Sequence, residues 1–187
     1  MFSFRLDSGI RLELLSPRHA QELYEAVDRN REHLRPWMPW VDSTKSVAAI
    51  EAFISRTLDQ TASNSGFQTA IRSGEQLVGV VGMHGINWAN KSTSLGYWLA
   101  KEEQGKGTMT KACAAYIAHS FSDLNLHRIE IRCATENLRS RAIPERLGFL
   151  SEGIIREAEW VNGAFLDHVV YGLLSTEWTE VSEGSGS

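Results

Sequence analysis

Hydrophobic positions in the first third of the chain alternate with period two and then recur at helical spacing. Apolar and polar residues alternate over residues 10–14, which predicts a half-buried strand. Ser16-Pro17 then supplies an N-cap and a proline at the first helical position, ahead of an apolar stripe over residues 20–27. A second helix, capped by Ser46, is predicted over residues 50–58. The chain therefore begins with one strand and two helices.

The remaining pattern is that of strands separated by two helices. The predicted elements are a hairpin of strands 67–71 and 77–81, a strand over 94–99, a helix over 109–121, a strand over 128–133, a short helix over 141–147, and a hairpin of strands 154–161 and 165–173. Asn162-Gly163 in the last hairpin is typical of a type I′ turn. The order β-α-α-β-β-β-α-β-α-β-β predicts the α/β (α+β) class, with one mixed sheet and helices on its faces.

An aromatic segment over residues 34–40 interrupts this pattern. Two prolines prevent a regular helix there, yet the segment carries Trp37 and Trp40. Such a segment forms either a hydrophobic cap over the core or the wall of a substrate pocket. We take Trp37 and Trp40 as candidate substrate-binding residues.

Length and composition describe an ordinary globular protein. With 187 residues, 42% hydrophobic and 22% charged, the chain fits a single domain over residues 1–180. Residues 181–187 form a Gly/Ser-rich tail that we expect to be disordered, and which resembles a remnant of cloning. Cys113 and Cys133 occupy apolar-periodic positions, so we interpret both as buried thiols and expect no disulfide and no metal site.

Charge and hydropathy limit the partners. A net charge of −4 argues against direct nucleic-acid binding, which needs a concentrated basic face, and is compatible with a cationic substrate. No apolar run approaches the roughly 20 residues that span a bilayer, and the N-terminus lacks the apolar core of a signal peptide. We therefore expect no membrane association and a cytoplasmic location.

The candidate chemistry begins at a glycine-rich turn that leads directly into a helix. Two glycines flanking a lysine let the backbone approach an anion closely, and the helix adds the positive end of its dipole. This arrangement predicts a socket for a phosphate-bearing cofactor. The turn consists of Gln104, Gly105, Lys106, Gly107, Thr108, Met109 and Thr110.

Two common phosphate motifs do not fit this turn. A Walker loop needs a glycine five residues before Gly105, where Ala100 stands, and Ser or Thr after the lysine, where Gly107 stands. A dinucleotide fingerprint needs a third glycine, which is missing. A helix entry without any ligand would show the same local pattern, so the surrounding segments must decide.

The ordered set of a glycine-bearing strand, this turn and helix, a further strand, Asn, Ser and a short helix resembles the Gcn5-related N-acetyltransferase (GNAT) superfamily. The resemblance covers roughly residues 10–178 and is closest to the RimJ/RimL-type branch, which acetylates N-terminal amines of ribosomal proteins. It implies a single-domain fold with a mostly antiparallel sheet and helices on both faces. The superfamily's pyrophosphate motif, Gln/Arg-x-x-Gly-x-Gly/Ala, matches residues 104–109 except at Met109.

The resemblance implies the cofactor and its contacts. Acetyl-CoA would place its pyrophosphate on residues 104–110 and its pantetheine arm along a bulged strand that includes Tyr97, Trp98 and Leu99. The segment Glu136-Asn137-x-x-Ser140 would line the thiol end, with Asn137 as a cofactor-binding residue.

The resemblance also implies direct transfer of acetyl to a primary amine. The amine must lose a proton, and the oxyanion and thiolate need donors. Glu159 is the implied base, acting directly or through water, and Ser140 is the implied donor to the thiolate. The Tyr97 N–H or its neighbours would polarise the thioester carbonyl. No covalent enzyme intermediate is expected, so neither cysteine is needed as a nucleophile.

Each role has an ordinary structural alternative. Glu159 is also explained as a solvated hairpin residue, and Ser140 as a cap of the helix beside it. Asn137 is also explained by turn geometry, and His84, a candidate acceptor-site residue, by a structural role. The Asp167-His168 pair would orient a ring only if the backbone bends, because adjacent strand residues point to opposite faces.

The acceptor and the functional class also have alternatives. A protein N-terminal amine is the first expectation, and a small amine or aminoglycoside is the second. A peptide needs an open groove, whereas a polyamine needs a ring of carboxylates. A different class is a CoA-binding sensor or interaction module with little catalysis, which would keep the turn and not need Glu159 or Ser140. The pattern does not determine the oligomeric state, and relatives of this branch often form homodimers.

Overall fold

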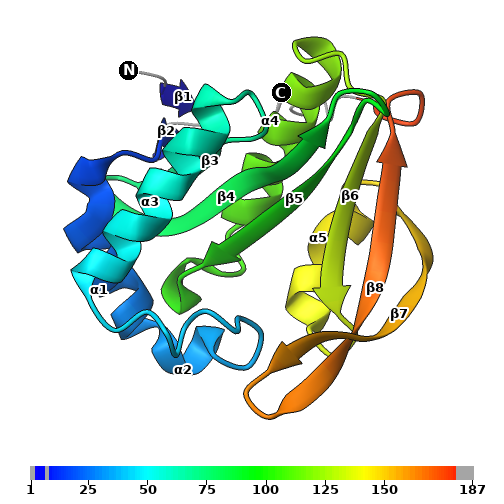
Figure 1. The fold of residues 1–187 in the computed structure, drawn as a ribbon. Coiled ribbons are helices and arrows are strands. Elements are labelled where there is room, and N and C mark those ends of the chain that lie inside the picture. The colour runs from blue at the N-terminus through cyan, green and yellow to red at the C-terminus, as the bar shows by residue number, and fades with distance from the viewer. Residues whose placement is uncertain (1–2, 7–8, 180–187) are drawn as a thin grey trace, which may run out of the picture.

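An eight-stranded sheet with helices on both faces forms the body of the molecule (Figure 1). The computed structural model describes residues 3–6 and 9–179, so the tail 181–187 lies outside the described residues. The strands are β1 (Ser3–Arg5), β2 (Ile10–Leu14), β3 (Gln68–Ser73), β4 (Gln76–Asn87), β5 (Ser92–Leu99), β6 (Arg128–Ala134), β7 (Leu150–Val161) and β8 (Ala164–Leu174). The α-helices are α1 (Ala20–Arg29), α2 (Arg31–Leu34), α3 (Val47–Ala62), α4 (Thr108–Ser122) and α5 (Leu138–Arg146), with short 3-10 turns at Pro17–His19 and Lys101–Glu103.

The sheet order β1-β2-β3-β4-β5-β6-β8-β7 is mostly antiparallel, and β5 and β6 run parallel. This confirms the predicted mixed, mostly antiparallel sheet. In space, β8 lies between β6 and the edge strand β7. The turn of the last hairpin has φ of 49° at Asn162 and 92° at Gly163, both positive as a type I′ turn requires.

Two hydrophobic cores lie on opposite faces of the sheet. One core joins α1 and α3 to the face that carries Ala70, Val80 and Trp98. The other joins α4 and the end of α5 to the face that carries Ile71, Val81 and Ile131. Adjacent residues of β3 and β4 thus enter different cores, which explains why the run from Leu77 to Met83 is apolar without interruption.

The sequence predicted some element boundaries incorrectly. β4 continues six residues beyond the predicted end at 81, because the polar and glycine residues there pair with β5 although they break the apolar run. α5 begins at Leu138 and not at 141, because Asn137 caps it by accepting a hydrogen bond from the Ser140 N–H. β1 and α2 were not predicted, since three or four residues are too few to show a period.

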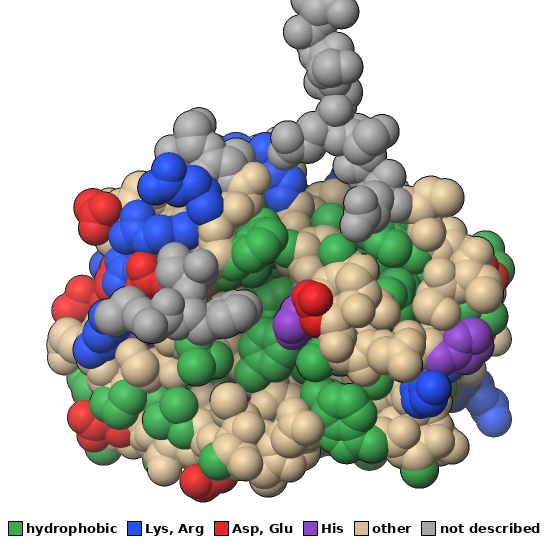
Figure 2. Space-filling model, turned by 90° about the horizontal axis from the view of Figure 1, so that it is seen from above, with side chains coloured by type: hydrophobic (Ala, Val, Ile, Leu, Met, Phe, Trp, Pro, Cys, Tyr) green, Lys and Arg blue, Asp and Glu red, His purple; other side chains and the backbone are tan. Residues whose placement is uncertain are grey.

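A buried charge cluster ties β2, β3 and α1 together at one end of the sheet. Glu13 on β2 contacts Arg11, His19 and Arg72, and Arg72 also contacts Glu22 on α1. Figure 2 shows Lys and Arg side chains gathered at the left, on the side where Figure 1 places β1 and β2. Paired carboxylates keep these cations compatible with burial.

Candidate active site

The centre of the sheet opens into a gap between β5 and β6. The two strands pair only from Ser92–Arg128 to Leu95–Ile131, and beyond Leu95 no pairing joins them. Figure 1 shows their C-terminal ends diverging, with α2 and the tip of the β7–β8 hairpin lying near the wide end. The Asn162 side chain donates to the Arg35 carbonyl and closes this end.

The backbone of β5 presents hydrogen-bonding groups to this gap. The Ala100 N–H donates to the Val78 carbonyl, in register with the pairing of β4 and β5. Because the N–H and C=O groups of successive strand residues point to alternate sides, those of the even-numbered residues in this stretch point to β4. The backbone groups of Tyr97 and Leu99 are therefore directed at the gap, where an extended arm could pair with them like an added strand. The backbone of Trp98 is directed at β4.

The bulge expected in β5 is absent from its pairing with β4. The register runs without a shift from Gly79–Leu99 to His84–Ser94. Gly96 has another role: a Cβ there would lie 2.4 Å from Nε2 of His84. The glycine thus lets the His84 ring lie over β5.

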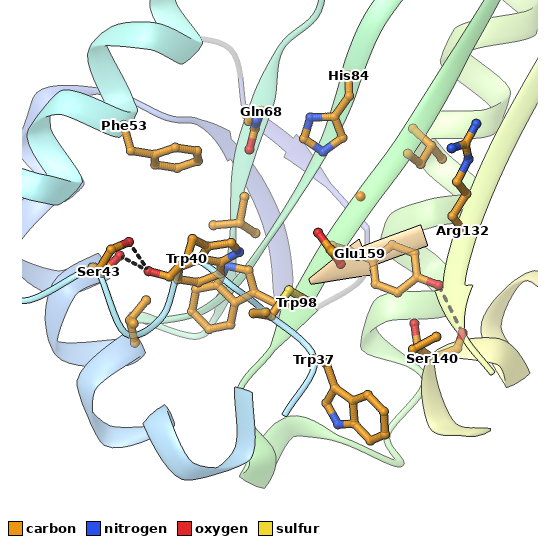
Figure 3. A pocket seen from close by; sticks show the side chains of 18 of the residues that line it. Trp37, Trp40, Ser43, Phe53, Gln68, His84, Trp98, Arg132, Ser140 and Glu159 are labelled. Carbon is orange, nitrogen blue, oxygen red and sulfur yellow. Dashed lines mark hydrogen bonds between the residues drawn. The ribbon is translucent and has the colours of Figure 1, made fainter. Parts of the chain in front are cut away.

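A cavity of about 780 Å³ extends from the gap to the face covered by α1 and α3. Figure 3 shows Trp40 and Trp98 side by side, with His84 above them, Glu159 and Ser140 to their right, and Trp37 below, nearer to Ser140. The Trp40 and Trp98 rings lie 6.3 Å apart. Eight of the predicted site residues line this cavity: Trp37, Trp40, His84, Tyr97, Trp98, Asn137, Ser140 and Glu159.

The glycine turn lies outside that cavity, between β5 and α4. Gly105 and Gly107 have φ of 77° and 79°, and a Cβ on either would meet only open space. The first N–H groups of α4 have no intrahelical acceptor, so they are available to an anion. Left-handed glycines, open space and a helix N-terminus fit the predicted pyrophosphate socket.

Met109 does not obstruct this socket. Its side chain is buried in the core beneath α4, where it packs with the other apolar residues of that face. The Met109 side chain, which departs from the family motif, therefore does not cover the N–H groups at the start of α4. Lys106 is exposed and its Nζ lies 2.9 Å from Glu103 Oε1.

Side chains from α2 and α5 hold Gln104 at the start of the turn. Its Nε2 lies 2.8 Å from His33 Nε2, and Arg139 donates to its Oε1 over 2.6 Å. Arg146 of α5 donates to Thr110 Oγ1 over 2.9 Å. The turn is thus held by side chains of both α2 and α5. Hydrophobic periodicity in the sequence does not predict these contacts.

Ser140 lies in the first turn of α5, and its hydroxyl lines the cavity. Its Oγ is 3.2 Å from Cys133 Sγ, and its carbonyl accepts a hydrogen bond of 3.1 Å from the Tyr97 hydroxyl. Pro144 has no N–H to offer that carbonyl, so the phenol takes the place of the missing helical donor. Asn137 both caps α5 and lines the cavity.

Both cysteines are free buried thiols, as predicted. Burial raises the pKa of Cys133 and of Cys113, so each thiol is held in its protonated form. This agrees with a reaction that uses no cysteine nucleophile.

Glu159 faces the cavity from β7. Of the described residues that line the cavity, it is the only carboxylate; Arg56 and Arg132 are the lining cations. Its Oε2 lies 3.5 Å from Nε2 of His168 on β8. This pair was not predicted, because the chain places Asp167, and not Glu159, next to His168 in sequence. Asp167 instead accepts a hydrogen bond from the Glu157 N–H.

The gap between β5 and β6, the glycine turn at the N-terminus of α4 and the adjoining cavity describe an α/β enzyme of the acyl-transferring class. The chain belongs to the acetyltransferase (GNAT) domain family, whose model matches residues 10–150. This confirms the predicted class, an N-acetyltransferase that uses acetyl-CoA.

Individual relatives match over nearly the whole chain. A Bacillus subtilis protein named "Putative ribosomal N-acetyltransferase YdaF" is 36% identical over 95% of this chain and 98% of its own. The [ribosomal protein uS5]-alanine N-acetyltransferase of Escherichia coli is 27% identical, over 90% and 89%. The microcin C7 self-immunity acetyltransferase MccE, solved with acetyl-CoA and AMP, is 28% identical with a TM-score of 0.86, over 90% and 94%. Among the described residues, no helix is long and apolar enough to cross a membrane.

Proposed function

We propose that this chain acetylates the N-terminal amine of a polypeptide. The observation that carries the proposal is the cavity beside the gap, which has aromatic walls and Glu159 as its one carboxylate among the described lining residues. A single carboxylate suits the removal of one proton from one ammonium group. A polyamine would need several carboxylates to hold its other charges, whereas Arg56 and Arg132 would repel them.

Glu159 is the general base in this proposal. An ammonium group has no lone pair, so its nitrogen attacks only after a proton moves to a base. The Glu159 carboxylate faces the cavity from β7 and takes that proton directly or through one water.

Ser140 is the proposed donor to the leaving sulfur. Ser140 lines the cavity from the first turn of α5, and its hydroxyl contacts the sulfur of Cys133 at 3.2 Å. A hydroxyl that already contacts one sulfur can rotate and donate a hydrogen bond to the thiolate of CoA. This donation stabilises the negative charge on the thiolate as it leaves.

Acetyl-CoA, the donor of the acetyl group, fits the β5 side of the site. When bound, acetyl-CoA supplies the acetyl group as a thioester. Residues 104–110 would hold its pyrophosphate on the N–H groups of the turn and of α4, and Tyr97 would pair with the arm and direct its N–H at the carbonyl. Asn137 would line the thiol end.

The names of the relatives support a protein acceptor. Two of them are named for ribosomal proteins, and such acceptors are met in the cytoplasm, where we place this protein. A small amine is the second candidate, supported by the aromatic cavity, in which Trp37 and Trp40 would enclose a compact acceptor.

A panel of amines tests the acceptor by thiol release from acetyl-CoA. We expect turnover with peptides that have a free N-terminus, and none with the same peptides after N-terminal blocking. Faster turnover with spermidine or an aminoglycoside than with any peptide would favour the small-amine alternative. Tight CoA binding without turnover on any amine would favour the sensor alternative.

A homodimer is a further part of the proposal. The edge strand β7 exposes Leu150, Ile154 and Ile155, and an apolar edge is stabilised when a second copy covers it. Light scattering of the protein and of Ile154→Lys tests this, with a dimer expected for the first and a monomer for the second. A monomer in both would contradict it.

A further inference from the structure

A register irregularity in the β7–β8 hairpin brings an imidazole to the proposed base. Near the turn, Glu159 pairs with Leu166, but Ile155 pairs with His168, so the register shifts between Ile155 and Glu159. Glu157 within the shift has φ of 52°, and its N–H donates to Asp167 over 2.8 Å. The Asp167 side chain therefore holds the irregular segment in place.

This arrangement directs Glu159 and His168 to the same side of the hairpin. His168 is two residues beyond the partner of Glu159, and residues at that diagonal spacing share a face. Both line the cavity, and their Nε2 and Oε2 atoms are 3.5 Å apart. The His168 side chain is 15% exposed and that of Glu159 is 38% exposed, so the imidazole lies deeper.

The other charged groups around this pair come from different strands. Arg132 on β6 lines the same cavity, but its guanidinium donates to Glu130 over 2.6 Å. His84 lines the cavity from β4, over Gly96. Among the ion pairs of the described residues, the one at Glu159 is with His168.

We propose that His168 is a positioning residue that holds the Glu159 carboxylate towards the acceptor amine. The inference rests on the proposed function, since it assigns His168 to the same proton transfer. The proton moves from the ammonium nitrogen to Glu159, and the imidazole fixes the carboxylate before and after that step. His168 contacts the base and not the reacting atoms.

A double-mutant cycle tests the inference through kinetics. We expect His168→Gln to lower kcat about tenfold, with the affinity for CoA unchanged, because a carboxylate without its imidazole contact is less firmly oriented towards the amine. In a Glu159→Gln background, His168→Gln should cause no further loss. An equal loss in both backgrounds would overturn the inference.

His119→Gln is the matched control. It removes another histidine–carboxylate pair, His119 with Asp123 at 2.7 Å, which lies on α4 outside the cavity. Its kcat should equal that of the unaltered protein.

A second readout needs no turnover. Ring signals of His168, followed by NMR at one fixed pH, should move in Glu159→Gln relative to the unaltered protein, because the carboxylate that contacts Nε2 is gone. Unchanged signals would overturn the pairing even if the protein acetylates amines. Moved signals in a protein that acetylates no amine would contradict the proposed function alone.

Discussion

The Tyr97 hydroxyl donates a hydrogen bond to the Ser140 carbonyl and thereby joins β5 to α5 across the gap. The carbonyl needs this partner because Pro144, four residues further on, has no N–H. One side chain of β5 thus fixes the helix turn that carries the proposed thiolate donor.

Tyr97→Phe should lower the free energy of unfolding by about 1 kcal/mol, because it leaves the Ser140 carbonyl without its donor. It should also lower kcat, since the first turn of α5 is less firmly held. Pro144→Ala restores a backbone N–H, so in that background Tyr97→Phe should cost less. Urea unfolding of the four proteins measures this, and an equal cost in both backgrounds would show that the phenol does not replace the helical donor.

Gly105→Ala and Gly107→Ala should each weaken CoA binding, because a Cβ at a left-handed φ costs about 1 kcal/mol and moves the N–H groups of the turn. Gly74→Ala is the control, since Gly74 has φ of 58° and open space around it but lies in the β3–β4 turn. Calorimetry with CoA should show weaker binding for the first two and an unchanged affinity for the third. Equal affinities in all three would remove the turn from the cofactor site.

Gly96→Ala should displace the His84 ring, because the new Cβ would lie 2.4 Å from its Nε2. The ring can turn away, so stability should change by less than about 1 kcal/mol, while the KM for the amine rises. Adding His84→Ala should make the Gly96→Ala change neutral. If Gly96→Ala raises KM by the same factor with and without His84, the ring does not carry the effect.

Stability should fall in acid through the cluster around Glu13. The hydrogen bonds of Arg11 and Arg72 outweigh burial and lower the pKa of Glu13 to about 2 from an ordinary 4.5. The unfolded chain therefore binds the proton first, and a stabilisation of roughly 3 kcal/mol, complete above about pH 5, is lost as the pH falls through both values. Burial also lowers the pKa of His19, which adds a loss in the same direction at higher pH.

Glu13→Gln tests that linkage. The variant should be less stable at neutral pH, and its stability should depend less on pH between about 5 and 2. Denaturant unfolding at several pH values measures both. A variant with the same pH dependence as the unaltered protein would show that other carboxylates cause the acid sensitivity.

Local patterns predicted the fold because its elements are long and their caps are ordinary. Ser46 accepts from the Ala49 N–H at the start of α3, and Asn162-Gly163 adopts the turn that its residue types favour. The short elements β1 and α2 depend on neighbours that pair with them or pack on them, so their sequences carried no detectable period.

The sequence predicted the candidate site only in part. Eight of the predicted residues line one cavity, although they come from five separate segments. The contacts between Glu159 and His168 and between Gln104 and Arg139 were missed, because each depends on the register of a hairpin or on the meeting of two distant elements. The sequence also does not show why a methionine at position 109 is compatible with the turn, because the reason is the burial of its side chain in the core.

The most direct test is to locate the acetyl group on a peptide that has both a free N-terminus and an internal lysine. Tandem mass spectrometry after incubation with labelled acetyl-CoA should find the label on the α-amine with the unaltered protein, and far less of it with Glu159→Gln at equal CoA affinity. Label on the lysine alone, or equal labelling by both proteins, would contradict the proposal that Glu159 serves the acetylation of an N-terminal amine.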